Sequence, residues 1–369
     1  MKKPIFLLCL LFIALTSAVV HAQGSELPLI LWIQGDLYSV DSLTAPPTQI
    51  TNGGTISGPE LAPDGTTIAY KSADQIGLNA LNRIQATGKI ADFDLPGDIY
   101  VLDIATHKST QVVGQPPDAS LLVDNVADKA TIRSTPVWSP DGKSLAWTEY
   151  AYPGGKPQIV VDTLASNTQT VLASDLNAPL IQGAAPPLRW GSAGLAVNAS
   201  TDDAGEQDYL IYGNDGTLLS SPRIAPVDND PVLDFVWVES ANGAQLGLIY
   251  QSSRWILIDP KTGVAQAASE LPRLVTASSN SQALRFGVDK DQGYYWEVVG
   301  TNAAAAGSPA QVTLSPSGRQ VAFTGFPSSG GVTIWQDGNT TSIPNTGSNF
   351  NELQVGALLW GYTYWEIGS

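Results

Sequence analysis

The sequence predicts an all-β protein, a seven-bladed β-propeller, with six or eight blades as the alternatives. Three observations support this fold. A tight turn containing proline and glycine recurs, a short apolar strand recurs at regular spacing, and the strands at the two ends of the chain complement each other. The chain of 369 residues also contains 35 Gly and 25 Pro, which is typical of a turn-rich β protein.

The turn recurs at 62–65, 139–142 and 315–318. Proline presets the backbone for the second position of a type I turn, and glycine accepts the positive φ that closes a hairpin. Each turn leads into a strand that alternates apolar and aromatic residues. We therefore expect each turn to join the first two strands of a blade.

The third strand of the unit predicts the blade count. Seven copies occur, at 36–41, 98–103, 158–162, 208–212, 254–259, 294–298 and 332–337. One copy for roughly every 50 residues suits a four-stranded propeller blade. The sixth blade is the weakest, because 301–307 is rich in alanine, which forms strands poorly.

The two ends of the chain predict a closed ring. The first strand-like segment, 28–33, has the pattern of a second strand, and 353–360 has the pattern of a first strand. Paired with each other, they complete one blade and leave no open edge. The final segment, 362–367, has no settled place in this scheme.

Residues 1–22 are expected to be a secretory signal peptide, followed by a single propeller domain at 23–369. Lys2 and Lys3 precede an apolar stretch, and Val20-His21-Ala22 supplies the small residues of a cleavage site. The leader predicts an extracytoplasmic protein, periplasmic or secreted. No second apolar run of about 18 residues follows, so we expect no transmembrane segment after cleavage.

Charge and composition exclude several classes of function. The net charge is −16, which argues against nucleic-acid binding, since that needs clustered Lys and Arg. Cys9 lies within the leader, so the mature chain forms no disulfide. His107, in the turn before a fourth strand, is the one histidine after the leader, which argues against a zinc site or a Ser-His-Asp triad.

The repeat resembles that of the TolB-type β-propeller family, a relative of the WD-type repeat. The resemblance rests on Trp-Ser-Pro-Asp-Gly at 138–142, Leu-Ala-Trp at 145–147 and Asp-Ile-Tyr-Val-Leu-Asp at 98–103. It covers most of 27–360, and it implies an extracytoplasmic binding scaffold. The same type of repeat also builds the propellers of prolyl-oligopeptidase-like enzymes.

Two insertions in blade two, 71–97 and 114–133, are the first candidates for binding. One lies between the second and third strands of the blade and the other follows its fourth strand, and in a propeller both of these connections emerge on the same face. Long loops on a rigid scaffold often carry function. Residues 75–84 suit a short helix with Asp74 as its N-cap and Leu78, Leu81 and Ile84 on one side. The alternative is that the insertions are decorations without a role.

Two tyrosines on the same predicted face are further candidates. Tyr150 and Tyr152 precede a Pro-Gly-Gly segment, and tyrosine is a common interface anchor. The alternative is that they cover the edge of the blade.

Calcium is a candidate cofactor, because hard oxygen ligands suit Ca²⁺ and exported proteins meet high calcium concentrations. Asp289 and Asp291 alternate ahead of a glycine, and Asp202 and Asp203 lie in a dense acidic loop. The alternative is that both are ordinary acidic turns, with no cofactor bound.

These observations favour a monomeric, non-enzymatic binding scaffold for a protein, peptide or glycan. The alternative function is a carbohydrate-active hydrolase or lyase that uses carboxylates at the central funnel. A third interpretation is a propeller stabilised by calcium.

Overall fold

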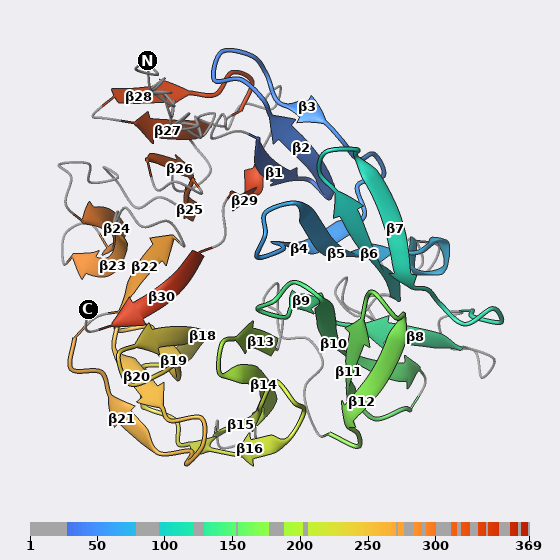
Figure 1. The fold of residues 1–369 in the computed structure, drawn as a ribbon, viewed down its shortest axis with the longest axis vertical. Coiled ribbons are helices and arrows are strands. Elements are labelled where there is room, and N and C mark those ends of the chain that lie inside the picture. Colours follow the sequence, from blue (N-terminus) through green and yellow to red (C-terminus); the bar gives the residue numbers. More distant parts are fainter. Residues whose placement is uncertain are drawn as a thin grey trace, which may run out of the picture.

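The computed structural model describes residues 28–78, 96–120, 129–152, 154–176, 188–201, 206–270, 272–276, 283–289, 293–299, 311–315, 319–324, 331–336, 339–346, 355–360 and 363–367. Strands dominate these residues, and their sheets stand around a common axis (Figure 1). The prediction of an all-β propeller is confirmed. Within these ranges no helix is long and apolar enough to cross a membrane. The predicted leader, 1–22, lies outside them and stays a prediction.

The first half of the chain, with one strand from its C-terminal end, forms four sheets. Blade one contains β29 (Val355–Leu359), β1 (Leu29–Ile33), β2 (Asp36–Val40) and β3 (Thr48–Gln49). Blade two contains β4 (Ile56–Leu61), β5 (Thr67–Ala73), β6 (Gly97–Asp103) and β7 (Lys108–Val113). Blade three contains β8 (Ala130–Arg133), β9 (Val137–Trp138), β10 (Ser144–Tyr152), β11 (Gln158–Thr163) and β12 (Thr168–Ala173). Blade four contains β13 (Leu188–Gly191), β14 (Gly194–Thr201), β15 (Gln207–Tyr212), β16 (Leu218–Ser220) and β17 (Arg223–Ile224).

The second half forms two sheets, one of them unusually wide. The wide sheet contains β18 (Val232–Ser240), β19 (Gln245–Tyr250), β20 (Trp255–Ile258), β21 (Ala265–Ala267), β22 (Arg273–Thr276), β23 (Ala283–Asp289), β24 (Gly293–Val299) and β30 (Thr363–Ile367). The last sheet contains β25 (Gln311–Leu314), β26 (Gln320–Thr324), β27 (Val332–Gln336) and β28 (Asn339–Ser342).

The prediction of seven blades is wrong, and the alternative of six is what the structure shows. The difference arises at β30, the final segment that the sequence left unplaced. Trp365 of β30 is opposite Val238 of β18 in a parallel pairing and opposite Leu274 of β22 in an antiparallel pairing. These hydrogen bonds merge the fifth and sixth sequence units into one eight-stranded sheet.

The predicted closure of the ring by its terminal strands is confirmed. Strand β1 pairs antiparallel with β29, with Leu31 opposite Leu358. Blade one therefore joins the first described strand to the last but one, and β1 has a partner on each side.

The predicted turns also form where the structure describes them. Gly65 and Gly142 have φ values of +73° and +68°, and each donates its N–H at 2.9 Å, to the carbonyls of Ala62 and Ser139. Pro316 to Gly318 lie outside the described residues. His107 is exposed in its turn with φ +55°, as the sequence predicted.

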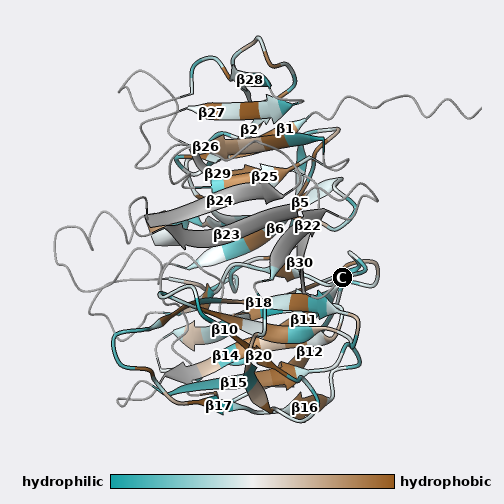
Figure 2. Ribbon diagram, turned by 90° about the vertical axis from the view of Figure 1, so that its left-hand side faces the viewer, coloured by the Kyte–Doolittle hydropathy of each residue, from teal (hydrophilic) through white to brown (hydrophobic). Residues whose placement is uncertain are grey.

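The apolar core lies between neighbouring sheets. One cluster combines Ile30 and Leu37 of blade one with Ile68 and Leu102 of blade two. The next combines Ile99 of blade two with residues of blade three. Figure 2 shows the ring from the side, with hydrophobic segments lying within the stacked strands. Burial of apolar surface between sheets therefore holds the ring together.

One core position is occupied by a charged residue type. Asp162 on β11 is fully buried, and neither of its carboxylate oxygens has a hydrogen-bond partner among the described residues. It lies opposite Leu145, just as Leu102 lies opposite Ile68 in blade two. A carboxylate therefore stands where the preceding repeat has a leucine.

Candidate functional site

One face of the ring collects the connections in which the sequence predicted binding. Strands β5, β10 and β19 end on this face, and β8 and β13 begin on it after the fourth strands of the preceding blades. We call it the loop face. The predicted insertions at 71–97 and 114–133 both leave the sheets there and return there, and the last four residues of the second one form β8.

Five residues at or next to the boundaries of these insertions meet in one hydrogen-bonded cluster. The Arg133 guanidinium donates from Nη1 to the Gly97 carbonyl and from Nη2 to the Gly114 carbonyl, each at 3.1 Å. The Lys71 ammonium donates to the Arg133 carbonyl at 2.7 Å. Arg133 is 4% exposed and Lys71 is 6% exposed. We call Lys71, Gly97, Gly114, Gln115 and Arg133 the root cluster.

Gln115 ties the second insertion to the first. Its Nε2 donates to the carbonyls of Gly97, at 3.1 Å, and Thr131, at 2.9 Å. Its Oε1 accepts from the Thr131 N–H at 2.8 Å. Gly97 permits this close approach, since a Cβ there would lie 2.7 Å from Cε of Lys71. The two insertions therefore leave the scaffold from one fixed point.

Glu149 on β10 balances the charge of Arg133. Its Oε2 accepts from Arg133 Nε at 2.8 Å and from Trp147 Nε1 at 3.0 Å, and its Oε1 accepts from Gln158 Nε2 at 3.0 Å. The ion pair is largely buried, because the side chains are 4% and 14% exposed. Removing one partner of such a pair leaves an uncompensated buried charge.

Two further carboxylates stand beside the root cluster. Asp74 Oδ1 accepts from the Gly77 N–H at 2.6 Å, so the predicted N-cap of the helical turn at 75–78 is confirmed. Burial raises the pKa of Asp74, with a smaller contribution from the nearby charge of Asp98, while Arg133 lowers it. Asp98 is 8% exposed, and its Oδ2 accepts from Gln111 at 2.7 Å.

The structure places only some of the predicted ligand-binding residues. Tyr150 and Tyr152 are half-buried at the loop-face end of β10, opposite Ile132 and Ala130 of β8. Leu78 is half-buried in the helical turn, while Leu81 and Ile84 lie outside the described residues.

The predicted calcium ligands are mostly undescribed as well. Asp202, Asp203 and Asp291 lie outside the described residues, and Asp289 ends β23, where the structure describes the backbone alone. In the part of the chain that the structure describes, no three metal-ligating side chains gather.

A second cluster of polar side chains, Glu60, Arg189 and Asp234, lies on the inner strands around the ring axis. The sequence analysis did not predict it. Glu60 on β4 accepts at Oε1 from the Trp138 N–H at 3.3 Å, and its carbonyl accepts from the Trp138 indole at 3.1 Å. Burial raises the pKa of Glu60 to about 7, while the Trp138 N–H and the charge of Arg189 act in the opposite direction. The side chain is deep among the inner strands but keeps some accessible surface.

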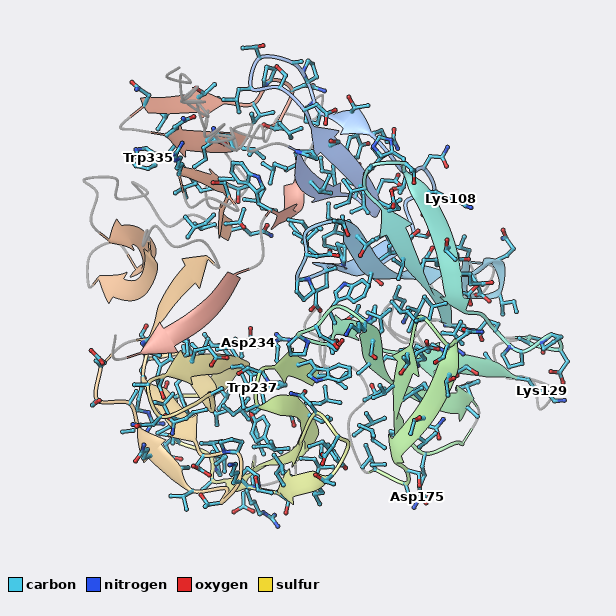
Figure 3. The ribbon with its side chains drawn as sticks, in the orientation of Figure 1. Lys108, Lys129, Asp175, Asp234, Trp237 and Trp335 are labelled. Carbon is cyan, nitrogen blue, oxygen red and sulfur yellow. The ribbon has the colours of Figure 1, made fainter. Side chains whose placement is uncertain are left out.

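Arg189 on β13, whose charge acts on Glu60, also contacts the neighbouring sheet. Its Nη2 donates to Asp234 Oδ1 on β18 at 2.7 Å, and its guanidinium lies 5.3 Å from the centroid of the Phe235 ring. In Figure 3, Asp234 lies on the inner side of its sheet, whereas Lys129, within the second insertion, lies at the outer rim. The sequence offered one signal for this cluster: Glu60 and Arg189 are charged residues that come just before the first tight turns of their blades.

The fold and its repeats define this protein as a β-propeller with an elaborated loop face. No family model matches the chain, and no curated protein matches it in sequence. Solved structures similar to it include TolB from Acinetobacter baumannii, with 16% identity over 92% of this chain and 65% of that chain, and a TM-score of 0.41. The expected resemblance holds as far as the β-propeller fold, which the sheets described above show.

Two other propellers have comparable similarity. An oligogalacturonate lyase in complex with manganese is 15% identical over 84% of this chain and 83% of that chain, with a TM-score of 0.49. The propeller domain of the Trilobed protease from Pyrococcus furiosus is 14% identical over 80% and 85%, with a TM-score of 0.45. At these identities the likeness concerns the fold alone.

Proposed function

We propose that this protein is an exported, monomeric, non-enzymatic binding scaffold that holds a protein, peptide or glycan on its loop face. The observation that carries the proposal is the root cluster. Arg133 joins the start and end of both insertions, which fixes the point from which they leave a rigid ring. Such fixed roots reduce the conformational entropy that a binding loop loses when its partner arrives.

The proposal is tested by replacing 74–94 with a short Gly-Ser linker. The variant should melt as the wild type does and should lose partners that the wild type captures from an extracytoplasmic extract. The matched control replaces the exposed residues 241–243, in a turn on the opposite face, with the same linker. Capture of the same partners by both variants would contradict the proposal.

Export is part of the same proposal, and the expected leader at 1–22 supports it. Cell fractionation should find the chain outside the cytoplasm with its amino terminus at Gln23. Retention of the full-length chain in the cytoplasm would contradict export.

A second candidate function is a hydrolase or lyase acting on carbohydrates. Its support is Glu60, since a carboxyl group with a pKa of about 7 can hold a proton for general acid catalysis near neutral pH. Asp234 supplies a second carboxylate on the inner strands, although Arg189 binds it. Wild-type protein and Glu60→Gln should be compared on a panel of oligosaccharides. Product formation by the wild type and its loss in the variant would favour the enzyme over the scaffold.

Calcium binding by Asp202, Asp203, Asp289 and Asp291 is a third proposal, supported by the pattern of acids in the sequence. A bound ion stabilises the folded state, so the melting temperature should rise with added calcium and fall with a chelator. An unchanged melting temperature would contradict a calcium site.

A further inference from the structure

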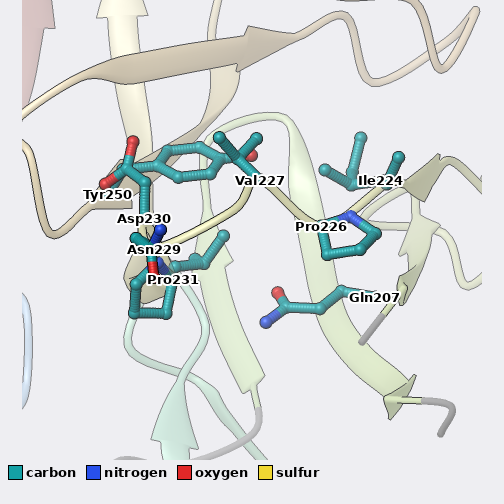
Figure 4. A pocket seen from close by; sticks show the side chains of 10 residues that line it. Gln207, Ile224, Pro226, Val227, Asn229, Asp230, Pro231 and Tyr250 are labelled. Atoms are coloured by element: carbon teal, nitrogen blue, oxygen red, sulfur yellow. The ribbon is translucent and has the colours of Figure 1, made fainter. Parts of the chain in front are cut away.

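A cavity lies on the loop face between blade four and the eight-stranded sheet (Figure 4). Its volume is about 310 Å³. Its lining comprises Gln207, Ile224, Ala225, Pro226, Val227, Asn229, Asp230, Pro231, Val232 and Tyr250. We call it the interblade cavity.

The strand order places this cavity on the same face as the root cluster. Gln207 begins β15, and Tyr250 ends β19. Residues 225–231 connect β17 to β18, and this connection corresponds to the insertion at 114–133 in blade two. The loop face therefore carries both the root cluster and the interblade cavity, in different sectors of the ring.

The lining suits an apolar side chain. Ile224, Val227 and Tyr250 supply apolar walls, and two prolines add surfaces without a backbone N–H. Val227 is 39% exposed, although it is a large aliphatic residue. The cavity volume is at the lower end of the range for ligand sites, which suits a single large side chain.

The walls are held in place before any ligand arrives. The Arg254 guanidinium stacks 4.1 Å from the centroid of the Tyr250 ring. The Gln251 N–H donates to the Pro231 carbonyl at 3.0 Å, which ties the connection 225–231 to the end of β19. A preformed cavity avoids the ordering cost that a mobile one imposes on binding.

The charges around the cavity are predominantly negative. Asp230 accepts from the Ser252 N–H at 2.7 Å and lies 3.5 Å from Nε of Arg254. Asp228 is exposed in the same connection. Two carboxylates of the connection 225–231 thus stand against one guanidinium group, in a chain of net charge −16, which favours a positively charged ligand.

We propose that the interblade cavity binds an aliphatic or aromatic side chain from a positively charged peptide segment. The inference deepens the proposed function, because it selects a peptide among the partner classes and gives it a second contact on the loop face. The apolar side chain fills the cavity, and flanking lysine or arginine residues face the surrounding carboxylates.

The test uses labelled synthetic pentapeptides and fluorescence anisotropy with the full chain. One peptide has a central phenylalanine between two lysines on each side. The second replaces the phenylalanine with alanine, and the third replaces the lysines with glutamates. The first should bind about tenfold more tightly than the second, because burial of the ring is lost, and the third should bind most weakly.

A matched pair of variants locates the binding. Val227→Lys places a charge in the cavity wall and should weaken binding of the first peptide about tenfold. Val264→Lys makes the same change at a valine that is 62% exposed in a turn on the opposite face, and should leave binding unchanged. Both valines are exposed, so both variants should fold.

Several results would overturn the inference: no binding of the first peptide, equal binding of the phenylalanine and alanine peptides, or equal effects of the two valine variants. The outcome is separable from that of the proposed function. Loss of partner capture by the 74–94 variant together with no peptide binding would remove the cavity proposal alone. Peptide binding together with unchanged capture by that variant would remove the role of the insertions and keep the cavity.

Discussion

Replacing Glu60 with glutamine should remove a loss of stability that sets in as the pH rises. The glutamine keeps the size of the side chain and an oxygen that accepts from the Trp138 N–H, so the main change is the charge. Burial raises the pKa of Glu60 from its ordinary value of 4.5 to about 7 in the folded protein. The folded state therefore holds this proton more tightly than the unfolded state.

The sign and size of the effect follow from linkage. Between about pH 4.5 and pH 7 the folded state binds more protons than the unfolded state, so stability falls as the pH rises. Above pH 7 the folded protein carries the buried charge at a cost of about 3 kcal/mol, from about 1.4 kcal/mol for each pKa unit. Glu60→Gln should therefore equal the wild type near pH 4.5 and exceed its stability by about 3 kcal/mol at pH 8.

Urea unfolding followed by tryptophan fluorescence, from pH 4.5 to pH 8, measures this difference. Glu270→Gln is the control, because Glu270 is exposed. A difference between wild type and Glu60→Gln that stays the same at both ends of the pH range would refute the reasoning.

Three further substitutions test buried contacts. Arg133→Met should destabilise the protein by about 3–5 kcal/mol, since it removes the ion-pair partner of the buried Glu149, and a melting temperature equal to that of the wild type would count against the root cluster. Asp162→Leu, which introduces the residue of the preceding repeat, should raise the free energy of unfolding by about 1–3 kcal/mol, measured by urea, because it removes two buried oxygens that lack hydrogen-bond partners, and a loss of stability would mean that the carboxyl group is satisfied. Gly97→Ala should lower stability by about 1–3 kcal/mol, measured in the same way, because the new methyl meets the Lys71 side chain and the Ser72 carbonyl oxygen, and an unchanged midpoint would show that both move aside.

The repeat could be predicted from the sequence because its signals are local. Proline and glycine in the turns at 62–65 and 139–142 determine backbone geometry within four residues, and the structure confirms both. Ring closure could be predicted because two strands at the ends of the chain each lacked a partner. The blade count failed because the pairing of β30 depends on the neighbours it meets in three dimensions, and its own residues do not specify them.

The candidate site was predicted in outline alone. The length of the insertions at 71–97 and 114–133 predicted them as candidates for binding, and their boundary residues meet in the root cluster. The hydrogen bond from Lys71 to Arg133 spans 62 residues, however, so no local pattern predicts it. Glu60 and Arg189 escaped notice for the same reason, since their mutual influence arises from the packing of separate inner strands.

The pairings of β29 and β30 limit how early the ring can be completed as the chain is synthesised. Strand β1 pairs with β29, and β18 and β22 both pair with β30. Strands β29 and β30 are synthesised last, so they must pair with strands that left the ribosome earlier. Contacts of such high sequence separation form slowly, because a long loop must close first. Until residues 355–367 are available, three strands expose unpaired edges that invite aggregation. The complete ring therefore forms only after these last strands have been made.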